Sequence, residues 1–308
     1  MPTSLRAALA AALVIAGCRR DGHHRRQIGV ALPVDTGTLA SELRRGMQPP
    51  ADSLGFELLL VAANGDPVRQ AAQLDSFVTR RVAAVLIEPV DGSDSAVTGA
   101  IGRATRARVP VFTVAAGAAG AAATPVVAHI GSDDRMGGEL LGWWVGNRLQ
   151  GGGNIVILDQ PGVATARDRV AGIRLALSRF PNVRVVASPA VEPASREAAR
   201  GKTATLLGAD QRIDAFLGTS DELALGALEA VEAAGRRDVF VVGFGAIPEA
   251  RAAIVRGSAL VADVMPDLYT IGRYAVLVAA SHLRGNRVAS LVPVAVHLVT
   301  RDSSGAPP

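Results

Sequence analysis

The sequence predicts an α/β fold with two doubly wound lobes, each built on a parallel sheet. From Gln27 onward, short runs of β-branched and leucine residues alternate with amphipathic stretches of helical length. Several runs are apolar throughout, which is typical of parallel strands covered on both faces. The runs outnumber the strands of one compact sheet, and no Pro/Ser-rich linker divides the chain. We therefore expect two lobes joined by several chain crossings.

The predicted strands recur at short intervals. They are Ile28–Val34, Phe56–Ala62, Val82–Ile87, Val109–Val114, Val126–Ile130, Asn154–Leu158, Val183–Ala187, Ile213–Leu217, Val239–Val242, Leu260–Val264 and Val292–Val299. The helical stretches between them include Asp66–Arg81, Arg135–Leu149, Arg167–Phe180, Asp221–Ala234 and Asp267–Leu283. The helix before Phe56 is expected to kink or stop early at Pro49 and Pro50, because proline lacks a backbone donor and clashes with the preceding turn.

The composition excludes a disordered chain and argues against nucleic-acid binding. The 308 residues are 49% hydrophobic and 19% charged, with a net charge of +4. The arginines are scattered, and the densest cluster, Arg19, Arg20, Arg25 and Arg26, lies outside any periodic segment. No basic helix and no aromatic-interleaved basic strip occurs, so we expect no nucleic-acid partner.

The N-terminal segment predicts export and a lipid anchor. An apolar run from Ala7 to Gly17 is shorter than the ~20 residues that span a bilayer and is typical of a signal-peptide core. It leads into Cys18 with small residues before the cysteine, which resembles the bacterial lipobox. We expect residues 1–17 to be a signal peptide, Cys18 to be lipidated, and residues 18–26 to form a basic tether beside lipid headgroups. An ordinary secretory leader followed by an incidental thiol is the alternative.

Several segments, taken in order, carry a family resemblance. They are Asn64–Pro67, Ala83–Asp91, His129–Asp134, Ala166–Gly172, Ser220–Leu228 and Val241–Phe244. Their order and spacing resemble the periplasmic sugar-binding proteins of the ribose-binding type, with the type 1 periplasmic binding fold. The resemblance implies two lobes joined by three hinge crossings, with a ligand closed between them. It places residues 27–131 and 266–294 in one lobe, residues 132–265 and 295–301 in the other, and residues 302–308 in a disordered tail.

The ligand positions that the resemblance implies have mostly changed. The family's two stacking phenylalanines, an asparagine, an aspartate-arginine pair, a second asparagine, an aspartate and a glutamine fall in turn on Leu39, Ala40, Glu88, Ala115, Ala116, Ser220, Gly245 and Pro266. One arginine is retained, as Arg169. Sugar recognition needs charged side chains for the hydroxyl groups and an aromatic ring for the C–H face. These changes therefore disfavour a typical pentose or hexose as the ligand.

Polar residues after the predicted strands supply the candidate replacements. We predict that the ligand is bound by Asp35, Thr36, Glu88, Asp91, Arg169, Ser220 and Gly245. Helix capping is the alternative role for Asp91, Ser220, Asp133 and Asp221. Two hypotheses stay open for Glu88 and Arg169. In the first, the two residues together bind a small polyol, a modified sugar or a cationic solute. In the second, they form a salt bridge with each other, and the protein binds a ligand weakly or not at all.

No pattern typical of catalysis, cofactor binding or a metal site stands out. His129, His282 and His297 lack metal-ligand spacing, and Gly243-Phe244-Gly245 lacks the third glycine of a dinucleotide fingerprint. The sequence therefore predicts no enzyme and no cofactor. It favours a lipid-anchored substrate-binding protein of an ABC importer, located in the periplasm or at the cell surface, with a membrane permease as partner. The alternative is a non-transport sensor or interaction protein that kept the fold and lost the sugar site.

Overall fold

The computed structural model describes residues 26–117, 126–150, 152–209 and 211–303. The predicted signal peptide, Cys18 and nearly all of the basic tether lie outside the described residues, as does the end of the predicted tail. Among the helices of the described ranges, none is both long and apolar enough to cross a membrane.

The first lobe is built on a sheet of six parallel strands in the order β11-β5-β4-β3-β1-β2. The strands are β1 (Arg26–Leu32), β2 (Phe56–Ala62), β3 (Ala84–Ile87), β4 (Val111–Val114), β5 (Ala128–Ser132) and β11 (Leu291–Val294). Helices α1 (Gly37–Ser53) and α9 (Leu268–Leu283) cover one face, and α2 (Pro67–Thr79) and α3 (Ser95–Arg106) cover the other. The short central strands β3 and β4 are buried along their whole length, as their uninterrupted apolar sequence predicted.

The second lobe repeats this design on strands in the order β12-β10-β9-β8-β6-β7. The strands are β6 (Gly152–Leu158), β7 (Asn182–Ala187), β8 (Ala215–Gly218), β9 (Phe240–Phe244), β10 (Leu260–Pro266) and β12 (Val296–Thr300). Helices α4 (Asp134–Arg148) and α5 (Ala164–Leu177) cover one face. The other face carries α6 (Arg196–Leu207), α7 (Asp221–Ala233) and α8 (Pro248–Val255). All pairs are parallel except β12, which runs antiparallel to β10.

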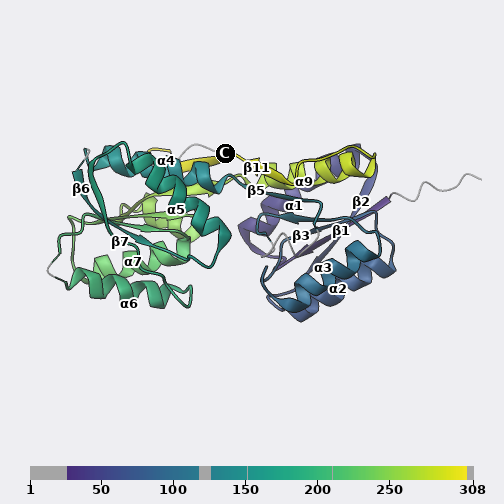
Figure 1. Ribbon diagram of the computed structural model, residues 1–308, viewed down its shortest axis with the longest axis horizontal. Coiled ribbons are helices and arrows are strands. Elements are labelled where there is room, and N and C mark those ends of the chain that lie inside the picture. The colour runs from purple at the N-terminus through teal and green to yellow at the C-terminus, as the bar shows by residue number, and fades with distance from the viewer. Residues whose placement is uncertain (1–25, 118–125, 151, 210, 304–308) are drawn as a thin grey trace, which may run out of the picture.

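The chain passes between the two lobes three times, from β5 to α4, from β10 to α9 and from β11 to β12. The first and third crossings lie side by side, since the backbone N–H of Asp133 donates to the carbonyl of Val294 at 2.7 Å. Figure 1 shows the two lobes next to each other with the crossings between them, and the strands of each sheet running toward the other lobe. The doubly wound fold with three crossings is therefore confirmed.

The prediction of one continuous strand at Val292–Val299 was wrong, and so was the early stop considered for the first helix. The predicted strand Val292–Val299 is divided into β11 and β12, because the chain crosses from one sheet to the other at Ala295. The first helix does not stop early but runs through Pro49 and Pro50 to Ser53. The two prolines lie in its last turns, where buried Met47, Pro50 and Ala51 pack into the core. This packing outweighs the two missing donors.

Candidate ligand-binding site

The candidate site is made by loops at the carboxyl ends of strands in both lobes. In open α/β sheets this edge is where ligands bind. In the first lobe, the loops after β1 and β3 are neighbours, because these strands pair directly and the N–H of Glu88 donates to the carbonyl of Ala31 at 3.0 Å. In the second lobe, β8 and β9 pair in the same way and bring Ser220 close to Gly245.

Glu88 is the most distinctive residue of the first lobe's edge. It directly follows β3 and is only 6% exposed. The buried side chain of Gln70 on α2 fixes its loop, donating to the carbonyl of Glu88 at 2.8 Å and accepting from the N–H of Val90 at 2.9 Å. The carboxyl oxygen Oε2 of Glu88 is buried and has no hydrogen-bond partner. Burial raises the pKa of Glu88 from 4.5 to about 7.

The other predicted residues of the first lobe are exposed. Asp35 lies in the loop after β1, and Thr36 occupies the N-cap position of α1 without a side-chain capping bond. Asp91 accepts from the N–H of Ser93 at 2.7 Å and from its hydroxyl at 2.6 Å, which lowers the pKa of Asp91. The residue that caps α3 is Asp94, so the capping alternative for Asp91 was wrong.

Arg169 on α5 is held from several sides at the second lobe's edge. Its Nε donates to Oδ1 of Asp134 at 2.8 Å, and its Nη2 lies 2.8 Å from the same oxygen. Its Nη1 donates to the carbonyl of Thr219 at 2.7 Å, and its guanidinium carbon lies 3.8 Å from the ring centroid of Phe244. Burial raises the pKa of Asp134, while the charge and hydrogen bond of Arg169 oppose that rise.

Close packing of α4 on α5 aligns Asp134 with Arg169. A Cβ atom on Gly138 of α4 would lie 2.1 Å from the carbonyl oxygen of Arg169. A Cβ atom on Gly172 of α5 would lie 2.1 Å from the carbonyl oxygen of Arg135. Only glycine permits such approach, so these two positions set the distance between the helices that carry the ion pair.

Ser220 and Gly245 lie beside a pair of buried acids. Ser220 occupies the N-cap position of α7 without a side-chain capping bond. Gly245 has φ +137°, and a Cβ atom there would lie 2.2 Å from Oδ2 of Asp221. That oxygen accepts from the N–H of Ile247 at 2.9 Å, so Asp221 braces the loop after β9 rather than capping α7. The carboxyl of Asp221 occupies the space that a side chain at position 245 would need.

Asp263 of β10 completes the buried pair. It is fully buried, and burial, followed by the charge of Asp221 and a hydrogen bond with it, raises the pKa of Asp263 well above 3.8. One oxygen of each acid, Oδ1 of Asp221 and Oδ2 of Asp263, lacks a donor from any other group. A single proton shared between the two carboxyl groups satisfies both oxygens.

The salt bridge considered between Glu88 and Arg169 does not form in this structure. Arg169 is paired with Asp134 of its own lobe, and Glu88 keeps an unpartnered oxygen. Sequence reasoning missed the roles of Asp134, Thr219, Phe244 and Asp263. A buried partner for Asp263 could have been predicted from the sequence, because a charged residue inside an apolar strand requires such a partner.

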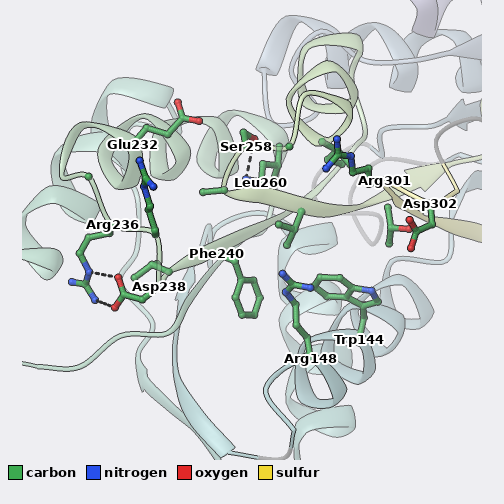
Figure 2. Close-up of a pocket in the computed structure, with 18 residues that line it drawn as sticks. Trp144, Arg148, Glu232, Arg236, Asp238, Phe240, Ser258, Leu260, Arg301 and Asp302 are labelled. Carbon is green, nitrogen blue, oxygen red and sulfur yellow. Dashed lines mark hydrogen bonds and ion pairs between the residues drawn. The ribbon is translucent and has the colours of Figure 1, made fainter.

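A cavity away from the candidate site lies at the opposite end of the second lobe. It has a volume of about 990 Å³ and is lined by the first residues of β9 and β10, the end of α4 and the last residues of β12 (Figure 2). Arg148 lies there 5.2 Å from the ring of Trp144 and 5.1 Å from that of Phe240. None of the predicted site residues lines this cavity. Within the described residues, no three His, Cys, Asp or Glu side chains gather as metal ligands would.

The fold and the position of the site define a class of two-lobed solute-binding protein. A family model described as a periplasmic binding protein domain matches residues 28–287, and the chain belongs to this family. The ribose import binding protein RbsB of Salmonella typhimurium is 33% identical over 264 residues, which cover 84% of this chain and 85% of that protein. A xylitol-binding protein of Mycolicibacterium smegmatis is 31% identical over 75% of this chain and 65% of its own length.

A solved structure of a solute-binding protein is similar to this chain in both fold and sequence. An ABC transporter solute binding protein from Bacillus halodurans with bound myo-inositol is 26% identical, with a TM-score of 0.73 over 91% of this chain and 96% of that one. The family consists of solute-binding proteins of ABC transporters, which act in the periplasm or at the cell surface and are not enzymes.

Proposed function

We propose that this chain is the substrate-binding protein of an ABC importer and that it closes its two lobes on a small polyhydroxylated solute. The observation that carries the proposal is Arg169, a largely buried cation on α5 that is held at the carboxyl edge of the second sheet. Three of its five N–H groups bind Asp134 and Thr219, which leaves two for ligand oxygens. Preorganised donors of this kind bind vicinal hydroxyl groups at little entropic cost.

The candidate residues of the first lobe favour a polyol over a stacked pyranose. At the two positions where the family resemblance implies stacking phenylalanines, Leu39 is 39% exposed and Ala40 is buried, so the first turn of α1 offers no aromatic ring to the face of a sugar. Glu88 supplies a carboxyl group at the position where the resemblance implies an asparagine. The relatives that bind xylitol and myo-inositol support a ligand of this kind.

Ligand binding tests this function directly. Purified protein would be screened by thermal shift and isothermal titration calorimetry with xylitol, myo-inositol, glycerol and ribose. A ligand at 100 times its Kd is expected to stabilise the protein by about 2.7 kcal/mol. Arg169→Lys should weaken binding at least tenfold, because lysine cannot reproduce the planar fork. Arg103→Ala, which removes an exposed pair with Asp75, is the matched control. Absence of stabilisation across a broad panel of sugars, polyols, nucleosides and amino acids would overturn the proposal.

We also propose that the protein is anchored to the membrane through lipidated Cys18 and delivers its ligand to a permease. The lipobox-like sequence before Cys18 supports the anchor, and the family supports the permease. Metabolic labelling with a fatty acid should mark the wild-type chain and not Cys18→Ser, and the variant should move to the soluble fraction. Uptake of the identified ligand should be lost in cells that lack this protein. Unlabelled wild type, or unchanged uptake, would refute the corresponding half of the proposal.

A further inference from the structure

Glu88 differs from the other buried acids of the candidate site. Asp134 binds the guanidinium of Arg169, and Asp263 and Asp221 accept hydrogen bonds from the backbone N–H groups of Ala246 and Ile247. Glu88 is buried to a similar degree, yet its Oε2 has no donor among the described residues. A buried acceptor without a donor destabilises the folded protein, and such groups are retained where a ligand completes them.

The charge around Glu88 narrows the chemistry of that ligand. The positive charge of Arg169 is already compensated by Asp134, with two guanidinium nitrogens 2.8 Å from one carboxyl oxygen. The arginines nearest to Arg169 in sequence, Arg167 and Arg174, are exposed, and so is Arg135 beside Asp134. Asp35 adds a further carboxylate after β1. Among the described residues, four buried acids, Glu88, Asp134, Asp221 and Asp263, therefore lie at or near the two strand edges, and of these Asp134 is the one paired with Arg169.

We propose that the site selects a polyhydroxy solute that carries a protonated amine, an amino sugar or an aminocyclitol, with the ammonium on Glu88 and hydroxyl groups on Arg169. This inference rests on the proposed function and assigns its substrate class. An ammonium group offers three donors and compensates the carboxylate, so its bonds to Glu88 are charge-assisted and about twice as strong as those of a neutral hydroxyl. An anionic solute would meet the same acids and be repelled.

Matched pairs of ligands test the inference. Affinities would be measured by calorimetry for myo-inositol and an amino analogue of it, xylitol and 1-amino-1-deoxyxylitol, and glucose and glucosamine. In at least one pair the amine is expected to bind about tenfold more tightly than its hydroxyl counterpart. N-acetylglucosamine, which keeps the nitrogen and loses the charge, should not gain affinity.

The isosteric variant Glu88→Gln identifies the residue that recognises the amine. In this variant the preference within the pair should fall to less than about threefold, while the neutral compound still binds. Arg169→Lys should weaken both members of the pair and leave their ratio nearly unchanged. Thermal unfolding of each variant would confirm that it is folded.

The number of protons released on ligand binding gives a second test. A Glu88 with a purely structural role would release none. Burial holds the pKa of Glu88 at about 7, so at pH 6 an ammonium ligand must displace its proton into the buffer. Titrations in buffers of different ionisation enthalpy should show close to one proton released by the amine and none by the neutral polyol. The other titratable groups of this edge are exposed Asp35 and Asp91, half-buried Asp94 and half-buried His129 on β5. The proton release must therefore vanish in Glu88→Gln if Glu88 is its source.

The outcomes separate the two proposals. Neutral polyols that bind as tightly as their amines, or a preference that persists in Glu88→Gln, would overturn the amine inference and leave the solute-binding function standing. If no compound of either kind binds, both are overturned.

Discussion

The central carbon of the Arg169 guanidinium lies over the ring of Phe244, 3.8 Å from its centroid. Phe244 is the last residue of β9, and Asp134 is the first of α4, so residues far apart in sequence hold one cation. The ring covers one face of the guanidinium while Asp134 and Thr219 engage its edge. A cation constrained in this way is preorganised for a ligand.

Breaking the ion pair should cost stability. Asp134→Ala leaves Arg169, whose side chain is 16% exposed, without its counter-charge, and the free energy of unfolding is expected to fall by about 3 kcal/mol. Urea denaturation measures the change. Asp75→Ala, which breaks an exposed pair with Arg103, should cost less than about 1 kcal/mol. Equal losses in the two variants would show that the buried pair has no special role.

Glu88 should make the unliganded protein less stable as the pH rises. Its pKa is about 7 when folded and close to 4.5 when unfolded, so its favourable contribution is complete below pH 4.5 and is lost as the pH rises through 7. Glu88→Gln removes this dependence. The gain in the free energy of unfolding that the substitution causes should therefore be about 3 kcal/mol larger at pH 8 than at pH 4.5. Denaturation curves at the two pH values provide the measurement. The exposed Glu197→Gln serves as control and should leave the profile as in the wild type.

The Asp221–Asp263 pair should also make the stability of the folded protein decrease as the pH rises. The raised pKa of Asp263 means that its stabilisation is full below about pH 3.8 and is lost as the pH rises through the folded value. Asp263→Asn keeps a donor for Asp221 and does not titrate, so its melting temperature should vary less with pH than that of the wild type. Calorimetric scans from pH 5 to pH 9 test this. A steeper profile in the variant would contradict a shared proton.

Gly245 should tolerate no side chain. Gly245→Ala places a Cβ atom 2.2 Å from Oδ2 of Asp221 at φ +137°, so both steric overlap and backbone strain oppose it. We expect a loss of at least about 2 kcal/mol together with weaker ligand binding. Gly285→Ala, at φ +85° with nothing within 4 Å of the added carbon, carries only the backbone cost. Similar losses in the two variants would mean that Asp221 moves aside freely.

Some of the site was open to prediction from sequence and some was not. Glu88 was identifiable as a candidate because it directly follows an apolar strand, and Arg169 because it lies in the segment Ala166–Gly172 that carries the family resemblance. Their partners were not identifiable. The sequence left open a bridge between Glu88 and Arg169, whereas the structure pairs Arg169 with Asp134, since Gly138 and Gly172 bring α4 against α5.

The sequence by itself determined the alternation of strands and helices, the parallel character of the sheets and the presence of two lobes. These properties depend on hydrophobic periodicity and on turn residues, which are local along the chain. The tertiary structure alone decided that the helix carrying Pro49 and Pro50 continues, that Arg169 pairs with Asp134, and that Glu88 keeps an unpartnered oxygen. Each of these depends on contacts between segments distant in sequence, whose distances and burial are set only when the elements pack together.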